Sequence, residues 1–157
     1  MPTRPLPHDP YANAVMDALE AKGLIDRDDS WAEYNDDNGE IMLMEIAITL
    51  DANRAEKAGW THGALLKWNQ IRGWEWGPGT DGALLQYVQR LATGPVPDPD
   101  SIVRGARRIL AGAFDAGMLP VTSTHRPPAQ TITPPLQKAL ADGDIGLDMA
   151  QHLSAYA

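Results

Sequence analysis

The strongest pattern along the chain is an alternation of apolar and mixed positions over residues 40–50. Every second side chain of the stretch is apolar. A period of two is typical of a β-strand with one face buried. The pair Asn38-Gly39 separates this strand from a second one at 31–37. Such a pair favours a two-residue hairpin turn, because both central residues of that turn need a positive φ.

A second hairpin is predicted between residues 64–69 and 73–77, each of which places two large apolar side chains on one face. The Gly-Pro-Gly run at 77–79 is expected to end the sheet, because proline cannot donate a hydrogen bond to a neighbouring strand. The two hairpins together predict a four-stranded antiparallel meander.

Apolar residues at helical spacing predict helices at 10–22, 80–92 and 101–116. The first begins with an Asp-Pro pair, and the third follows a Pro/Asp/Ser cluster, both of which favour a helix start. Residues 52–58 fit either a short helix or part of a long crossover loop.

The C-terminal part of the chain differs in character. We interpret residues 118–135, which are rich in proline and threonine, as a linker between a domain at 9–117 and a helical tail at 136–157. The tail is too small for a core of its own, so it docks on the domain, pairs with another chain, or stays disordered. The predicted class is α+β: an antiparallel meander of three to five strands with helices mainly on one face, plus this tail.

Composition excludes several kinds of function. The chain has 157 residues, a formal net charge of −8 and no cysteine. The acidic balance opposes binding to duplex nucleic acid or to an anionic membrane. Without cysteine there is no disulfide, thiolate metal site or thiol nucleophile. We therefore expect a soluble, cytoplasmic protein without a cofactor.

Several short segments together resemble an uncharacterised actinobacterial domain family of unknown function, which shows a Leu-Leu-x-Trp motif followed by Gly-Trp. The matching segments are Tyr11…Ala18-Leu19, residues 40–50, Ala64-Leu65-Leu66-Lys67-Trp68-Asn69, Gly73-Trp74-Glu75-Trp76 and residues 95–100. The resemblance covers about residues 10–116. The turn after Trp68 is less charged than is usual in the family, and the chain beyond 120 has no counterpart. The resemblance implies an actinobacterial source and a compact α+β domain, but no activity and no catalytic residues.

No catalytic constellation stands out in the sequence. The four histidines are scattered, and His8 and His125 are expected in mobile proline-rich segments. His62, beside Trp60, is the best single candidate, although a surface histidine is the simpler interpretation. A calcium loop around Asn38-Gly39 would need a carboxylate where Tyr34 stands. An acidic cluster fits either a solvated surface or a divalent-metal site; its members are Asp26, Asp28, Asp29, Glu33, Asp36 and Asp37.

Two groups of residues are candidates for binding. The first is aromatic and comprises Trp60, Trp68, Trp74 and Trp76. These rings either fill the core or form an exposed aromatic patch on the sheet. The second is a basic face of the 101–116 helix, formed by Arg104, Arg107 and Arg108. It either pairs with nearby carboxylates or contacts a phosphate or an acidic partner.

These observations favour a non-catalytic interaction module that binds a protein partner, through a Trp-bearing sheet face or through the C-terminal helices. Trp74 and Trp76 are the leading residues of that sheet face. One alternative is an acidic inhibitor of the immunity type, whose surface covers a basic active site. Another is a small metal-dependent hydrolase that uses the acidic cluster with His62. Self-association through 136–157 is also open.

Overall fold

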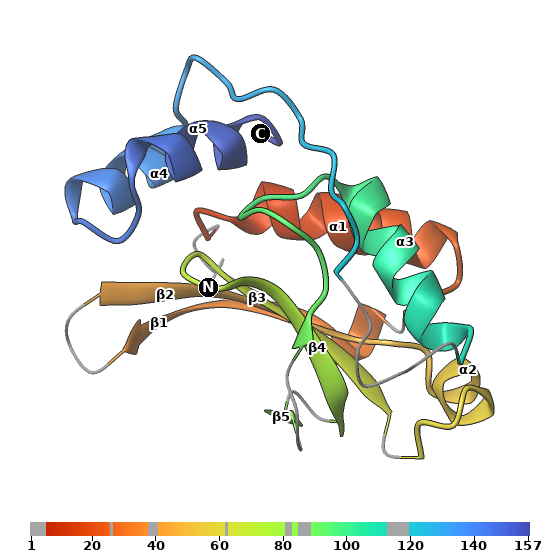
Figure 1. Cartoon of the computed structure of the whole chain (residues 1–157). Coiled ribbons are helices and arrows are strands. Elements are labelled where there is room, and N and C mark those ends of the chain that lie inside the picture. Colours follow the sequence, from red (N-terminus) through yellow and green to blue (C-terminus); the bar gives the residue numbers. More distant parts are fainter. Residues whose placement is uncertain are drawn as a thin grey trace.

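The computed structural model describes residues 6–25, 27–37, 41–61, 63–80, 83–84, 89–112 and 120–157. Figure 1 shows one layer of helices above a sheet. The elements, in chain order, are α1 Asp9–Ala21, the 3-10 turn η1 Arg27–Asp29, β1 Trp31–Asp37, β2 Ile41–Thr49, α2 Ala52–Lys57, β3 Ala64–Asn69, β4 Gly73–Thr80, β5 Ala83–Leu84, β6 Gln89–Arg90, α3 Pro99–Leu110, α4 Pro134–Ala141 and α5 Leu147–Ser154.

The described strands form an antiparallel sheet in the order β1-β2-β3-β4-β5, with β6 also paired to β4. From β1 to β5 each strand pairs with the next strand in the chain, so the predicted α+β meander is confirmed, while β6 returns to pair with β4. In the register, Asp37 faces Ile41 and Asn69 faces Gly73 across the two hairpins. The predicted Asn38-Gly39 turn itself lies outside the described residues.

The predicted helix at 80–92 is wrong. Ala83–Leu84 and Gln89–Arg90 are short strands that pair antiparallel with β4. The expectation that 77–79 ends the sheet is also wrong, because β4 continues to Thr80. Pro78 is tolerated in β4 because it faces Ala64, the first residue of β3, where the ladder between the two strands ends.

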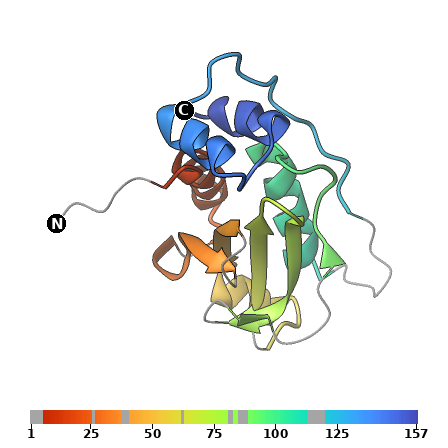
Figure 2. The same ribbon diagram turned by 90° about the vertical axis from the view of Figure 1, so that its left-hand side faces the viewer.

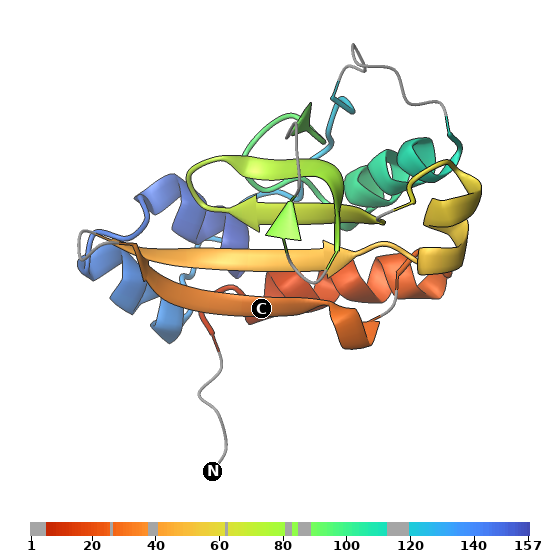
Figure 3. The same cartoon turned by 90° about the horizontal axis from the view of Figure 1, so that it is seen from below.

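One face of the sheet is covered by helices. On α1, Tyr11, Val15 and Leu19 recur every four residues and are fully buried. On α3, Ile102 and Ile109 are likewise fully buried. Figure 3 views the molecule from below, where the strands lie in front of the helices. The predicted one-sided helix layer is therefore confirmed.

The C-terminal helices are docked on the rest of the protein. Leu136, Ala139 and Leu153 are buried and belong to the same hydrophobic cluster as Tyr11 and Trp68. Figure 2 shows α4 and α5 side by side above one end of the molecule, next to α1. One hydrophobic core therefore spans the predicted domain and the predicted tail, and of the three possibilities for the tail the structure shows docking.

The predicted linker is fixed along its first described residues. The backbone N–H of Val121 donates to Leu91 O at 2.9 Å, and Thr93 N donates to Val121 O at 3.0 Å. Asp98 N then donates to Thr124 O at 2.9 Å. We call the paired segments 91–93 and 121–123 the ribbon. The ribbon, together with the bond from Asp98 to Thr124, holds residues 121–124 beside the N-terminus of α3.

Two side chains complete the edge of β2 where it extends beyond β3. The amide of Gln70 accepts from Met44 N at 2.9 Å and donates to Met42 O at 2.7 Å. The carboxylate of Asp144, from the turn between α4 and α5, accepts from Met42 N at 2.9 Å and from the Tyr34 hydroxyl at 2.5 Å. These bonds satisfy backbone groups that a shorter neighbour would leave unpaired, and they tie the C-terminal turn to the sheet.

Candidate functional site

The tryptophan cluster is part of the core. Trp68, Trp74 and Trp76 are at most 1 % exposed, and Trp60 is partly buried against them. The hypothesis of an exposed sheet face carried by Trp74 and Trp76 is therefore wrong. Their side chains point to the helix-covered face, because the cross-strand pairs Trp68–Trp74 and Leu66–Trp76 share the face that α1 packs on.

The indole and phenol groups instead fix a loop that leads into α3. Trp68 Nε1 donates to Pro95 O at 2.8 Å. The Tyr11 hydroxyl donates to Pro97 O at 2.6 Å and accepts from Trp74 Nε1 at 2.9 Å. Buried tyrosine and tryptophan usually find such partners for their polar atoms. The aromatic cluster is thus a scaffold for residues 95–97.

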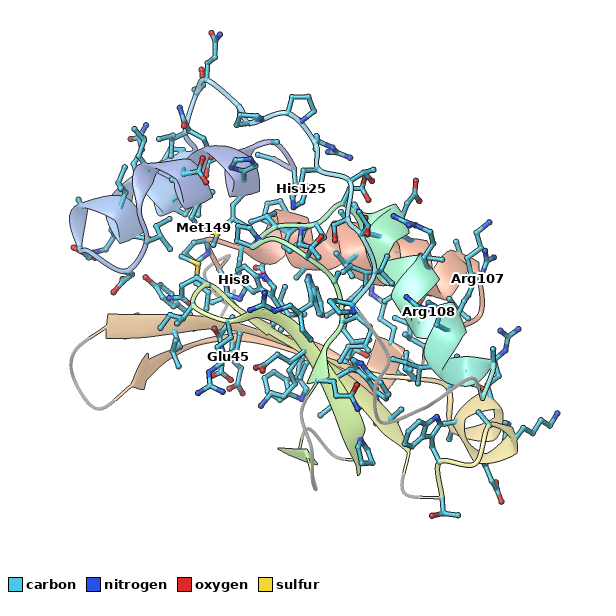
Figure 4. The ribbon with its side chains drawn as sticks, in the orientation of Figure 1. His8, Glu45, Arg107, Arg108, His125 and Met149 are labelled. Carbon is cyan, nitrogen blue, oxygen red and sulfur yellow. The ribbon has the colours of Figure 1, made fainter. Side chains whose placement is uncertain are left out.

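His8 and His125 lie in different surroundings. His8 is fully buried, which corrects its prediction as a mobile residue. Its Nε2 lies 2.9 Å from Glu45 O, its ring lies beside Trp68, and burial lowers its pKa. Figure 4 places it between α1 and the sheet. His125 is exposed and lies against Gly94; His62 lies outside the described residues.

The acidic cluster gives no support to a metal site. In the described part of the chain, no group of three or more His, Cys, Asp or Glu side chains could hold a metal ion. Asp28 and Asp29 lie in η1, and Glu33 is exposed on β1. Asp26 and the side chains of Asp36 and Asp37 lie outside the described residues.

The three predicted arginines are brought together on one side of α3. Arg104, Arg107 and Arg108 occupy positions i, i+3 and i+4 and are all exposed. They line an open groove of about 420 Å³, and its other described lining residues are Val121 and Thr122. We call this site the arginine groove. Figure 4 shows Arg107 and Arg108 on the outer side of α3, away from the sheet.

One arginine also helps to build the groove. Arg104 Nη2 donates to Thr122 O at 3.2 Å, across the groove, and lies 3.3 Å from Ser101 Oγ. This bond sets the distance between α3 and the 121–122 segment. Arg107 forms no ion pair with any described residue. Arg107 and Arg108 also lie in the last turn of the helix, where the helix dipole stabilises positive charge.

The start of α3 is held by a carboxylate. Asp98 caps the helix by accepting from Ser101 N at 3.0 Å and from the hydroxyls of Ser101 and Thr124. Burial by itself raises the pKa of Asp98, but these hydrogen bonds and the Arg104 charge bring the pKa below its ordinary value. Asp98 is therefore ionised at neutral pH and keeps α3 and residue 124 together.

Sequence reasoning found the arginines but missed the opposite wall of the groove. Val121 and Thr122 come from the proline-rich segment, which carries no periodic pattern. Their position is set by the hydrogen bonds of the ribbon, between residues about 30 apart in sequence. No local signal in the sequence marks such a pairing.

No protein-family model matches the chain, and no curated protein or solved structure matches it either. The resemblance to an actinobacterial family therefore stays a prediction. Across the described ranges, no helix combines the length and the apolar character needed to cross a membrane.

Proposed function

We propose that this protein is a non-catalytic interaction module that binds a short acidic segment of a protein partner in the arginine groove. The observation that carries the proposal is the convergence of Arg104, Arg107 and Arg108 on one open groove in a chain of net charge −8. Guanidinium groups form paired hydrogen bonds with carboxylates, so the groove complements aspartate and glutamate side chains.

The charge of the whole chain favours a short segment over a long polyanion. Charges further apart than about 8 Å are largely screened at physiological ionic strength. A short acidic peptide in the groove therefore interacts mainly with the three arginines. A nucleic-acid duplex extends over the acidic remainder of the surface and meets net repulsion.

The groove sits on a rigid frame, which supports binding. Trp60 Nε1 donates to Ile109 O at 3.2 Å and so ties α3 to the segment before β3. Arg104 and the ribbon fix the opposite wall. A preformed site loses less conformational entropy when a ligand binds than a mobile one does.

The C-terminal helices offer less surface than the sequence suggested. Several of their apolar side chains, including Leu136 and Leu153, are buried in the core, while Leu147 is 55 % exposed. One exposed leucine is normal for a protein surface. Self-association through residues 136–157 therefore has less apolar area available, and it stays a prediction.

The proposal is tested by fluorescence anisotropy with a labelled hexaglutamate peptide at an ionic strength of about 0.15 M, where the acidic remainder of the surface is screened. We expect saturable binding that weakens as salt is added, because the attraction is electrostatic. The variant Arg107→Glu/Arg108→Glu should weaken this binding by at least about tenfold, since attraction at two positions becomes repulsion. The position of Arg104 is left unchanged because its hydrogen bonds hold the groove together.

The matched control is Lys22→Glu/Lys57→Glu, which makes the same change in net charge at two exposed positions outside the groove. It should bind hexaglutamate with no more than a small loss. Equal loss in both variants, or no saturable binding to wild type, would contradict the proposal. Binding of hexalysine instead would favour the inhibitor alternative, and preference for a single-stranded oligonucleotide would show that the partner class is wrong.

A further inference from the structure

A second arginine-lined site includes residues that flank the 91–93 segment of the ribbon. It is a cleft of about 230 Å³ lined by Ile71, Arg72, Gly73, Arg90, Gly94 and Pro95. We call it the turn cleft, because the β3–β4 turn forms one wall and residues 94–95 form the other. Its residues do not overlap with those of the arginine groove.

The walls of the turn cleft are fixed close together. Gly73 has a φ of +71°, and a Cβ there would lie 3.3 Å from Gly94 O. The two backbones therefore approach more closely than most side chains allow. The hydrogen bond from Trp68 Nε1 to Pro95 O holds the second wall to β3. On the turn, Asn69 Oδ1 accepts from Ile71 N and Arg72 N.

Two arginines line the cleft from different elements of the fold. Arg72 comes from the β3–β4 turn and Arg90 from β6, and both side chains are exposed. Neither forms an ion pair with a described residue. Glu75 of β4 is the cross-strand partner of Arg90 in β6 and also of Lys67 in β3, and it does not line the cleft.

We propose that the turn cleft binds the phosphate group of a phosphomonoester, with Arg72 and Arg90 as its ligands. Two arginines and no carboxylate among the described lining residues match a phosphate, which carries about −1.5 to −2 charges at pH 7. The volume is below the roughly 300 Å³ at which pockets for larger organic ligands begin. It therefore takes a head group and leaves the rest of the ligand outside.

The rim of the cleft indicates what the rest of the ligand contacts. Ile71 lines the cleft and is 63 % exposed, one of two large apolar side chains so exposed among the described residues. An organic group attached to the phosphate oxygen would pack on this side chain, whereas free inorganic phosphate would gain nothing from it. An ester should therefore bind more tightly than inorganic phosphate.

Calorimetric titration of the full chain at an ionic strength of about 0.15 M, where distant charges are screened, tests the site with inorganic phosphate, phenyl phosphate and acetate as probes. We expect phosphate to bind more tightly than acetate, and phenyl phosphate more tightly than phosphate. Arg72→Gln/Arg90→Gln should weaken binding of both phosphates by at least about tenfold. Ile71→Ser should remove the preference for the ester but keep phosphate binding.

The charge-matched control is Lys22→Gln/Lys57→Gln, which should bind both phosphates like wild type. Absence of saturable phosphate binding, equal affinity for acetate, or full binding by Arg72→Gln/Arg90→Gln would overturn the assignment. The turn cleft and the arginine groove can be tested separately. Arg107→Glu/Arg108→Glu should leave phosphate binding in the turn cleft unchanged, and loss of phosphate binding in that variant would count against the turn cleft.

Discussion

Replacement of Asp144 by alanine should destabilise the protein strongly. Asp144 is 7 % exposed, and its carboxylate accepts hydrogen bonds from Tyr34 Oη and Met42 N. Burial, reinforced by the bond to Asp144, raises the pKa of Tyr34 well above its ordinary value, so the phenol remains a donor. The substitution leaves both donors unpaired at the point where the C-terminal turn meets the sheet.

The magnitude follows from the bonds that are lost. A hydrogen bond to a charged group contributes about 1.5–3 kcal/mol. Removal of a buried carboxylate relieves part of its desolvation cost, so we expect a net loss of about 3 kcal/mol in the free energy of unfolding. For a protein of this size, that corresponds to a fall in Tm of roughly 6–12 °C. Urea unfolding followed by circular dichroism measures the change.

The matched control lies two residues away. Asp142 carries the same charge, is exposed, and its carboxylate accepts a hydrogen bond from Lys138 Nζ at 3.0 Å. Exposed ion pairs contribute little to stability, so Asp142→Ala should change the unfolding free energy by less than about 1 kcal/mol. Equal effects of the two substitutions would refute the reasoning that Asp144 joins the C-terminal turn to the sheet.

Two further predictions concern the core. Leu153 is 1 % exposed, whereas Leu147 in the same helix is 55 % exposed. Leu153→Ala should therefore lower the free energy of unfolding by about 2–5 kcal/mol, and Leu147→Ala by less than about 0.5 kcal/mol, as measured by thermal or urea unfolding. Similar losses in the two variants would argue against docking of α5. Burial lowers the pKa of His8 in the folded protein from its ordinary 6.5. As the pH falls, the unfolded chain therefore takes up a proton on this histidine at a higher pH than the folded protein does, and stability should decrease below about pH 6.5. His8→Gln should flatten the slope of unfolding free energy between pH 7.5 and 5.5, and an unchanged slope would show that His8 does not cause it.

Local sequence patterns were sufficient for the first four strands of the sheet. The strands at 31–37 and 64–69 have the predicted bounds, because their alternation and turn residues are local signals. The prediction for segment 80–92 was wrong because its apolar spacing fits a helix, whereas residues 83–84 and 89–90 pair with β4. Tertiary pairing overrode that local preference.

Long-range contacts were beyond local patterns. The burial of Trp74 depends on Tyr11, 63 residues away, and the role of Asp144 depends on Tyr34, 110 residues away. The short apolar faces of α4 and α5 predicted helices but not what those helices cover. The arginines of α3 were found from helical spacing, while Arg72 and Arg90 stand 18 positions apart without a shared motif and meet only in the folded chain.

The most direct test of the arginine groove is a nuclear magnetic resonance titration that follows the side-chain Nε–Hε signals of the arginines as hexaglutamate is added. We expect the largest shifts at Arg107 and Arg108, and little change at Arg54, which is exposed on α2 and lies outside the groove. Shifts of equal size at all arginines, or the largest shifts on α4 and α5, would contradict the proposal that the groove on α3 is the binding site.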